Sequence, residues 1–137
     1  MANETEIVLE YSNFAAIGEQ MAREIDVVCE STALDIQARA QMAIMNPPKS
    51  GRIYRRGNVA HQASAPGEAP ATDTGALVNS AYTKKLADAD YETGFTVEYA
   101  AALEFGTPKI EPRPYLRPAV EAVRKAFIAA IKRIVER

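Results

Sequence analysis

Cysteine, histidine and tryptophan are scarce or absent in this chain, and this excludes several kinds of functional site. It has one cysteine, Cys29, one histidine, His61, and no tryptophan among 137 residues. A single cysteine excludes a disulfide within the chain and a cysteine metal cluster, and it suits a reducing, cytosolic site of synthesis. One histidine and one cysteine far apart in sequence do not make a metal-ligand set. Without tryptophan, no indole can line a sugar or peptide pocket.

Long apolar runs are also missing. No stretch reaches the ~18 apolar residues that a membrane-spanning helix needs, so we expect no contact with a membrane. The start of the chain is acidic and lacks the basic-then-apolar order of a secretory signal. The length fits one domain, residues 1–137, and a composition of 47% apolar and 25% charged residues is typical of a soluble globular protein.

Charge of one sign is scarce at each end of the chain. Residues 1–35 hold eight acids and a single base, Arg23, whereas residues 113–137 hold seven bases and two acids. Opposite charges at the two ends suit head-to-tail contacts between copies in a ring, and they suit equally a neutralising contact within one molecule. The overall net charge of −2 argues against a free nucleic-acid-binding protein, whose domain is normally basic.

An amphipathic pattern predicts a long helix before residue 47. From Phe14 onward, apolar side chains recur at helical spacing until Pro47-Pro48 stops the pattern. At about 1.5 Å per residue, this helix is roughly 45–50 Å long. Glu6–Tyr11 fits a short strand ahead of it, and Ser12 or Asn13 can cap it. Its acidic side chains form a solvated or partner-facing surface rather than a cation site; they are Glu19, Glu24, Asp26, Glu30 and Asp35.

Residues 47–72 are too long and too rich in proline and glycine to be an ordinary connection. Compact domains join their elements with about 4–6 residues, and loops beyond roughly 12–15 residues are commonly functional or disordered. We expect a small hairpin around Gly57-Asn58, followed by an extended Pro-rich stretch, and thus a protruding basic arm. The side chains expected to contact a partner or line a DNA channel are Lys49, Arg52, Tyr54, Arg55 and Arg56. They either contact phosphates or pair with an acidic surface of a neighbouring subunit.

After the arm, the pattern predicts a short helix and two antiparallel strands. Asp73 or Thr74 is the expected N-cap of the helix. The strands are 81–86 and 91–99, joined by the four residues between Leu86 and Tyr91.

The C-terminal third begins with one helical turn closed by Gly106 and a second Pro-rich connector. Pro118 is expected as the first residue of the last helix. The apolar stripe of that helix consists of Val120, Val123, Phe127, Ile131 and Ile134, and its basic side carries Arg124, Lys125, Lys132 and Arg133. The predicted class is therefore α+β: a long N-terminal helix and a C-terminal helix packed on a small antiparallel sheet, with a long extended arm or hairpin loop.

One run of residues matches an enzyme motif. Asp73-Thr74-Gly75-Ala76 is also found in dimeric retroviral-type aspartic proteases, where two aspartates share a proton and activate water. The residues before it make a poor strand, and two long helices do not belong in that small β fold, so a helix cap is the favoured interpretation. His61 has Ser50 or Ser64 as imaginable partners, but no strained nucleophile turn surrounds them. We predict no enzyme and no cofactor, with the protease and a regulatory nucleic-acid binder as alternatives.

Three blocks of residues in order suggest a family. With the chain from about residue 10 to 135, they resemble the neck or tail-completion proteins of long-tailed bacteriophages, which are encoded between head-closure and tail-terminator genes. The blocks are Asp73-Thr74-Gly75-Ala76-Leu77, then Tyr99-Ala100 with Glu104-Phe105-Gly106-Thr107, then Arg113-Pro114-Tyr115-Leu116-Arg117-Pro118.

The resemblance implies a virion structural protein of the head–tail junction, synthesised in the host cytoplasm. Copies would form a homo-oligomeric ring, six-fold or twelve-fold, around the channel that passes the genome, next to head-closure and tail-terminator or tail-tube proteins. Non-specific contact with genomic DNA is possible in such a channel. Phe105 and Gly106 are expected in the core turn of the fold, and the family supplies no catalytic residue. The expected inter-subunit contacts are Arg113, Pro114, Tyr115 and Leu116.

Overall fold

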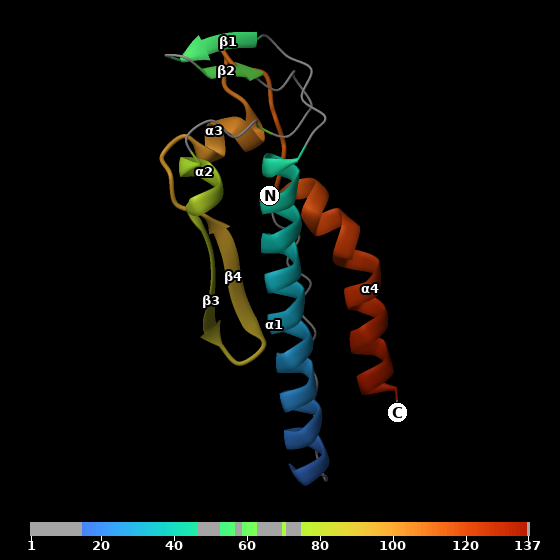
Figure 1. The fold of residues 1–137 in the computed structure, drawn as a ribbon. Helices are drawn as coiled ribbons and strands as arrows, with labels where there is room; N and C mark the ends of the chain where they lie inside the picture. The colour runs from blue at the N-terminus through green and yellow to red at the C-terminus, as the bar shows by residue number, and fades with distance from the viewer. Residues whose placement is uncertain (1–14, 47–52, 57–58, 63–69, 71–74, 137) are drawn as a thin grey trace.

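A long helix, a β-hairpin and a C-terminal helix make up most of the computed structural model (Figure 1). It describes residues 15–46, 53–56, 59–62, 70 and 75–136. The elements in order are α1 (Ala15–Met45), β1 (Ile53–Arg56), β2 (Val59–Gln62), α2 (Ala76–Asn79), β3 (Ala81–Ala87), β4 (Asp90–Phe95), α3 (Ala100–Phe105) and α4 (Arg117–Val135). The α+β class predicted from the sequence is confirmed, whereas the strand expected at Glu6–Tyr11 lies outside the described residues.

Helix α1 is the axis of the molecule. Its 31 residues span about 46 Å, as the apolar spacing and the following prolines predict. The β3–β4 hairpin packs along one side of α1, and α4 packs antiparallel on another side (Figure 1). The sequence predicted that the terminal helix packs on the sheet. In the structure this helix makes its main contacts with α1 instead.

The two strands of the hairpin pair antiparallel, with Thr83 opposite Thr93 and Ala81 opposite Phe95. Thr83 donates to the side-chain oxygen of Gln37 on α1, which shows that this face of the sheet covers the helix. The prediction that the second strand runs to residue 99 is wrong, because β4 ends at Phe95. The partner strand begins at Ala81, and one further bond, from the Thr96 N–H to the Ser80 carbonyl at 3.2 Å, ends the pairing before the chain enters α3.

Two predicted helix starts are compared with the structure. Gly75, with a left-handed φ of 81°, precedes the first residue of α2, and the predicted caps Asp73 and Thr74 lie outside the described residues. Helix α4 begins at Arg117, one residue before Pro118, although the proline does lie in the first turn, where its missing N–H costs nothing.

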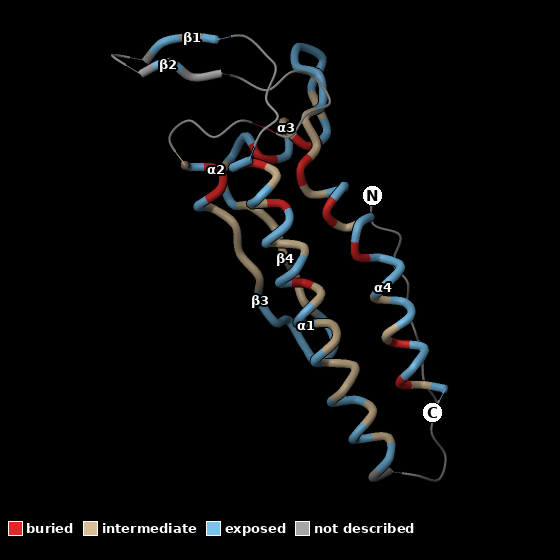
Figure 2. Tube along the Cα trace, turned by 45° about the vertical axis from the view of Figure 1, so that its right-hand side comes forward, coloured by how far each residue is buried: buried red, intermediate tan, exposed pale blue. Residues whose placement is uncertain are grey.

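The main core gathers where the upper end of α1 meets α2, α3 and the start of α4 (Figure 2). Its buried members are Ala40, Ile44, Leu77, Val78, Ala100, Tyr115 and Ala119. The rings of Phe95 and Tyr115 meet edge to face with their centroids 4.9 Å apart, a favourable aromatic geometry. This cluster joins the hairpin to both long helices.

The predicted apolar stripe of α4 faces α1. Val123, Ile131 and Ile134 are buried, Val120 and Phe127 are partly buried, and the four predicted basic residues of the other side are exposed. Because α1 and α4 run antiparallel, the second half of α4 lies beside the middle of α1, and the first turns of α1 extend past the end of α4 (Figure 1).

Candidate functional site

The basic arm contains the predicted hairpin. Strands β1 and β2 pair antiparallel, with Tyr54 opposite His61 and Arg55 opposite Ala60, and they project beyond the end of α1 (Figure 1). Arg55 is exposed, and Arg56 is the last residue of β1. Lys49 and Arg52 lie outside the described residues. A contact of this arm with a partner or with DNA stays a prediction.

A buried carboxylate organises the second Pro-rich connector. The side chain of Glu104 on α3 is buried, and its two oxygens accept hydrogen bonds from the backbone N–H groups of Tyr115, Leu116 and Arg117 at 3.1, 2.8 and 3.1 Å. These N–H groups open α4 and have no partner within that helix. A negative charge at a helix N-terminus is also favoured by the helix dipole. Glu104 therefore caps α4 from a distance of more than ten residues in sequence, a role that we did not predict.

Tyr115 belongs to the core of its own chain. Its side chain is 3% exposed, and its hydroxyl donates to the carbonyl oxygen of Ala100 at 2.8 Å. Burial, with a smaller contribution from Glu104, raises the pKa of Tyr115 to about 12. The expectation that this ring docks into a neighbouring subunit needs correction, because in this conformation the ring fills the chain's own interior.

Phe105 lies opposite to expectation as well. It was predicted in the core turn, but it is 59% exposed and the Arg117 guanidinium lies 5.9 Å from its ring centroid. Of the two neighbouring residues, Glu104 is the buried one, because three backbone N–H groups donate to its carboxylate. Phe105 therefore lies on the outer side of α3. Gly106 does close this turn, with φ 77°, as predicted.

Arg113 is held at the backbone but not at the guanidinium. Its N–H donates to the Leu103 carbonyl at 2.6 Å, whereas its Nε is buried and lacks a hydrogen-bond partner among the described residues. Pro114 and Leu116 flank Tyr115 and are half-buried. Contacts of Arg113, Pro114 and Leu116 with another subunit stay predictions.

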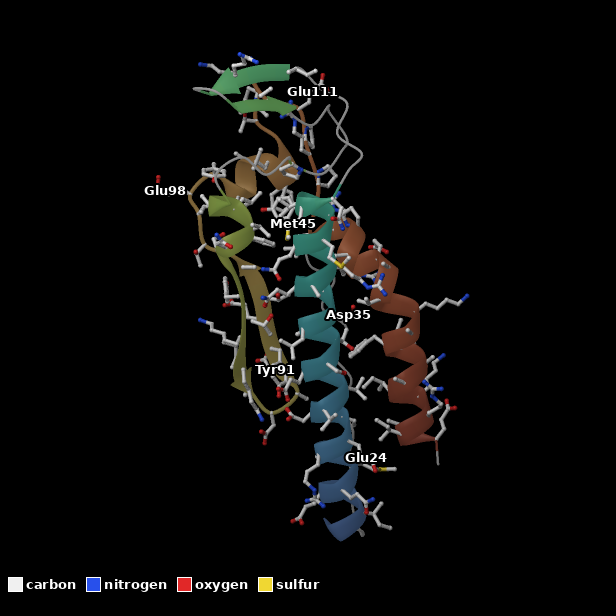
Figure 3. All side chains as sticks on the ribbon, in the orientation of Figure 1. Glu24, Asp35, Met45, Tyr91, Glu98 and Glu111 are labelled. Atoms are coloured by element: carbon white, nitrogen blue, oxygen red, sulfur yellow. The ribbon has the colours of Figure 1, made fainter. Side chains whose placement is uncertain are left out.

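One acidic residue of α1 ties the helix to the hairpin turn. Asp26 accepts hydrogen bonds from the Ala89 N–H at 2.7 Å, the Tyr91 hydroxyl at 3.0 Å and Lys85 Nζ at 3.2 Å. The Ala89 backbone bond, followed by the bonds from Lys85 and Tyr91, lowers the pKa of Asp26 despite partial desolvation. Asp26 was predicted as part of a solvated or partner-facing surface; it instead makes contacts within the chain (Figure 3, where Tyr91 is labelled between hairpin and helix).

An open apolar groove of about 690 Å³ lies between β4 and α4, with α1 as its floor. We call it the β4–α4 groove. Cys29 and Ala33 belong to the floor, and Tyr91 and Thr93 to the β4 wall. Burial, then the nearby Asp26 charge, raises the pKa of the Cys29 thiol. The α4 wall is formed by Val120, Val123, Arg124, Phe127, Ile128, Ile131 and Lys132.

The residues considered for catalysis are not assembled into a site that the structure describes. Asp73, Ser50 and Ser64 lie outside the described residues, and His61 is a strand residue of β2. Within the described ranges, no three His, Cys, Asp or Glu side chains are grouped so as to hold a metal ion. No helix in the same ranges is both long and apolar enough to cross a bilayer.

Comparison of the chain with protein-family models, with curated proteins and with solved structures gave no match. Three surfaces within the described residues are candidates for binding a partner. They are the basic hairpin, the outer side of α3 with its connector, and the β4–α4 groove.

Proposed function

We propose that this chain is a virion structural protein of the phage head–tail junction, in which copies form a ring around the DNA channel. The proposal starts from the three residue blocks that resemble neck and tail-completion proteins. Identical subunits and the adjacent head-closure and tail-terminator or tail-tube proteins are its partners in this proposal. No catalytic step is part of it.

The three blocks contact one another in the fold, which supports treating them as one unit. Leu77 from the first block, Ala100 from the second and Tyr115 from the third lie in one core cluster. Glu104 joins the second block to the third through three backbone hydrogen bonds. A match of three separated blocks is more specific when their residues cooperate in one structural element than when they are scattered.

The observation that supports assembly is a group of exposed apolar and aromatic side chains around α3. Tyr99, Phe105 and Ile110 are 47%, 59% and 44% exposed, and they lie at the start of α3, at its end and in the following connector. Aromatic side chains and arginine are enriched in protein interfaces. The exposed Arg117, whose guanidinium lies 5.9 Å from the Phe105 ring centroid, belongs to the same surface.

The test is a mass measurement of the assembled particle, made on the chain alone and with purified head-closure and tail-terminator proteins. We expect a ring, and we expect Phe105→Glu to shift it toward monomers. Leu86→Glu is the matched control, because Leu86 is similarly exposed, at 53%, but lies on the hairpin. A wild-type chain that stays monomeric in every mixture contradicts the proposal. So does a virion that keeps an intact head–tail junction without this protein.

Contact with the genome is a separate part of the proposal. The exposed Arg55 lies on a hairpin that projects from the body, where it can reach phosphates without reading sequence (Figure 1). Binding of duplex DNA should weaken steeply with salt and fall further in Arg55→Ala. Lys125→Ala removes an exposed base from α4 instead and serves as the control. Equal loss in both variants would assign any binding to general charge rather than to the arm.

A further inference from the structure

A fourth exposed surface is an apolar stripe along α1. Val27, Leu34, Met42 and Met45 are all at least half exposed, and Ala38 between them is exposed too. At about 100° per residue, Leu34, Ala38 and Met45 lie within about 20° of the direction of Val27 around the helix, and Met42 lies about 60° to one side. We call these five residues the α1 stripe.

No element that the structure describes covers this stripe. Gln37 and Asp26, which bond to the hairpin, lie about 80–100° to one side of it. Thr32, which lines a cleft together with α4, lies about 140° to the other side. The hairpin and α4 therefore flank α1, and the side of the helix toward the viewer in Figure 1 stays open. Because a helix that is apolar on all sides is normally buried, we expect the stripe to have a partner.

The spacing of the stripe is unchanged when the helix is reversed. Positions 27, 34, 38 and 45 follow one another with the a/d spacing of a coiled coil. Reversed about its midpoint at residue 36, this series falls on itself, so Val27 takes the place of Met45 and Leu34 that of Ala38. An antiparallel second copy would thus set the large Leu34 against the small Ala38 on both sides of the midpoint, which favours close packing.

The charges beside the stripe are complementary under the same reversal. Arg39 Nε lies 3.1 Å from Asp35 Oδ1, and both side chains are about half exposed. They lie about 80–120° from the stripe, where the flanking charges of a coiled coil are found. In a copy reversed about residue 36, Asp35 falls within about two residues of the partner's Arg39, and symmetry repeats the contact. Since this edge carries one charge of each sign, it fits a copy of itself better than a strongly acidic or basic partner.

We propose that free copies of this chain form an antiparallel two-fold pair through the α1 stripe, with the axis at the level of residue 36. The contact spans residues 27–45, about 27 Å of helix. Such a pair has no overall direction, whereas the subunits of a ring at a head–tail junction all point the same way. The pair is therefore a separate assembly of the free chain, and it does not depend on the proposed ring.

Mass measurements on the full-length wild-type chain over a dilution series test for the pair. We expect dimers, and Leu34→Glu should raise their dissociation constant about 100-fold or more, because both copies place this side chain near the centre of the contact. Ile17→Glu is the matched control: Ile17 is 53% exposed on the same helix, against 50% for Leu34, but lies outside residues 27–45. Equal weakening by both variants overturns the proposal. So does a wild-type chain without dimers at any concentration, since another segment or a different protein then covers the stripe.

Cross-linking tests the direction of the two helices. Full-length Val27→Cys and Met45→Cys variants, each with the single native Cys29 changed to alanine, are treated with a short bismaleimide, separately and as an equal mixture. In an antiparallel pair, position 27 of one copy lies about 27 Å from position 27 of the other but beside position 45. We expect cross-linked dimers to form about ten-fold faster or more in the mixture than in either variant alone. Equal rates, or faster cross-linking of the separate variants, overturn the proposal.

The surfaces used separate this pair from the proposed ring. Phe105→Glu should disrupt the ring and leave the pair intact, whereas Leu34→Glu should disrupt the pair and leave the ring intact. A dimer that is broken by Phe105→Glu but not by Leu34→Glu overturns the pair and leaves the ring proposal standing. A dimer that depends on Leu34, found without any ring, supports the pair and contradicts only the ring.

Discussion

Glu104 and Tyr115 bind each other's segments in both directions: the Glu104 carboxylate accepts the Tyr115 N–H at 3.1 Å, and the Tyr115 hydroxyl donates to the first residue of the helix that carries Glu104, at 2.8 Å. This exchange fixes the Pro-rich connector between α3 and α4 without a regular ladder of bonds. The C-terminal end of the connector is therefore tied to α3 through Tyr115.

Glu104→Ala should destabilise the fold by about 3 kcal/mol, because three backbone donors at the start of α4 lose their acceptor and each unpaired buried donor costs about 1–3 kcal/mol. Urea unfolding at neutral pH measures this. The matched control is Glu98→Ala, since Glu98 lies just before α3 but is exposed (Figure 3). Its effect should stay within about 0.5 kcal/mol. Similar losses in both variants would contradict the capping role.

Gly106→Ala should cost more stability than Gly75→Ala. Both glycines have a positive φ, 77° at Gly106 and 81° at Gly75, and another residue held in such a conformation costs about 1–3 kcal/mol. At Gly106 an added Cβ would also lie 2.8 Å from Pro112 Cδ and 2.9 Å from the Ile110 carbonyl oxygen, whereas at Gly75 it would meet the movable end of Asn79 at 3.1 Å. Thermal unfolding of the two variants ranks them, and the reverse order would show that the connector yields easily.

The contribution of Asp26 should depend on pH. In the folded state the pKa of Asp26 is lowered below its ordinary value of 3.8, so its stabilisation is present above the unfolded pKa and is lost as pH falls through the folded pKa. The stability gap between wild type and Asp26→Asn should therefore narrow below about pH 4. Thr83→Val, which breaks the non-titrating contact with Gln37, should show a gap that does not change with pH. A constant gap for Asp26→Asn would rule out the charge interaction with Lys85 and the turn.

Tyr115→Phe should cost about 1 kcal/mol at neutral pH, because the ring contact with Phe95 remains and only the hydrogen bond to Ala100 is lost. The folded pKa of about 12 lies above the ordinary tyrosine value of 10, so the phenol stabilises the fold below about pH 10 and this contribution is lost as pH rises toward 12. Denaturant unfolding between neutral pH and pH 11 should show a smaller alkaline loss in the variant. Tyr99→Phe, at an exposed ring, is the control.

Local patterns were enough to predict the long elements. The apolar spacing in α1 and α4, the turn pair between β1 and β2, and the left-handed Gly106 all depend on residues within a few positions of each other. For the same reason, the α+β class was correct, and boundaries shifted by several residues where a partner strand ended, as at Phe95, and by one residue at the start of α4.

Contacts between residues that are far apart in sequence could not be predicted from local patterns. Nothing near Glu104 indicates that backbone donors more than ten residues later will surround it, so the apolar Phe105 was the obvious candidate for burial. Tyr115 was assigned to an interface because aromatic side chains in a Pro-rich connector are typical of both interfaces and cores. The groove depends on three elements at once, and no local pattern predicts it.

The position of α1 between the hairpin and α4 has a mechanical consequence. Since each of these elements makes its main contacts with α1, a load applied to α4 reaches the hairpin turn by way of the helix, with Asp26 as a fixed point of attachment.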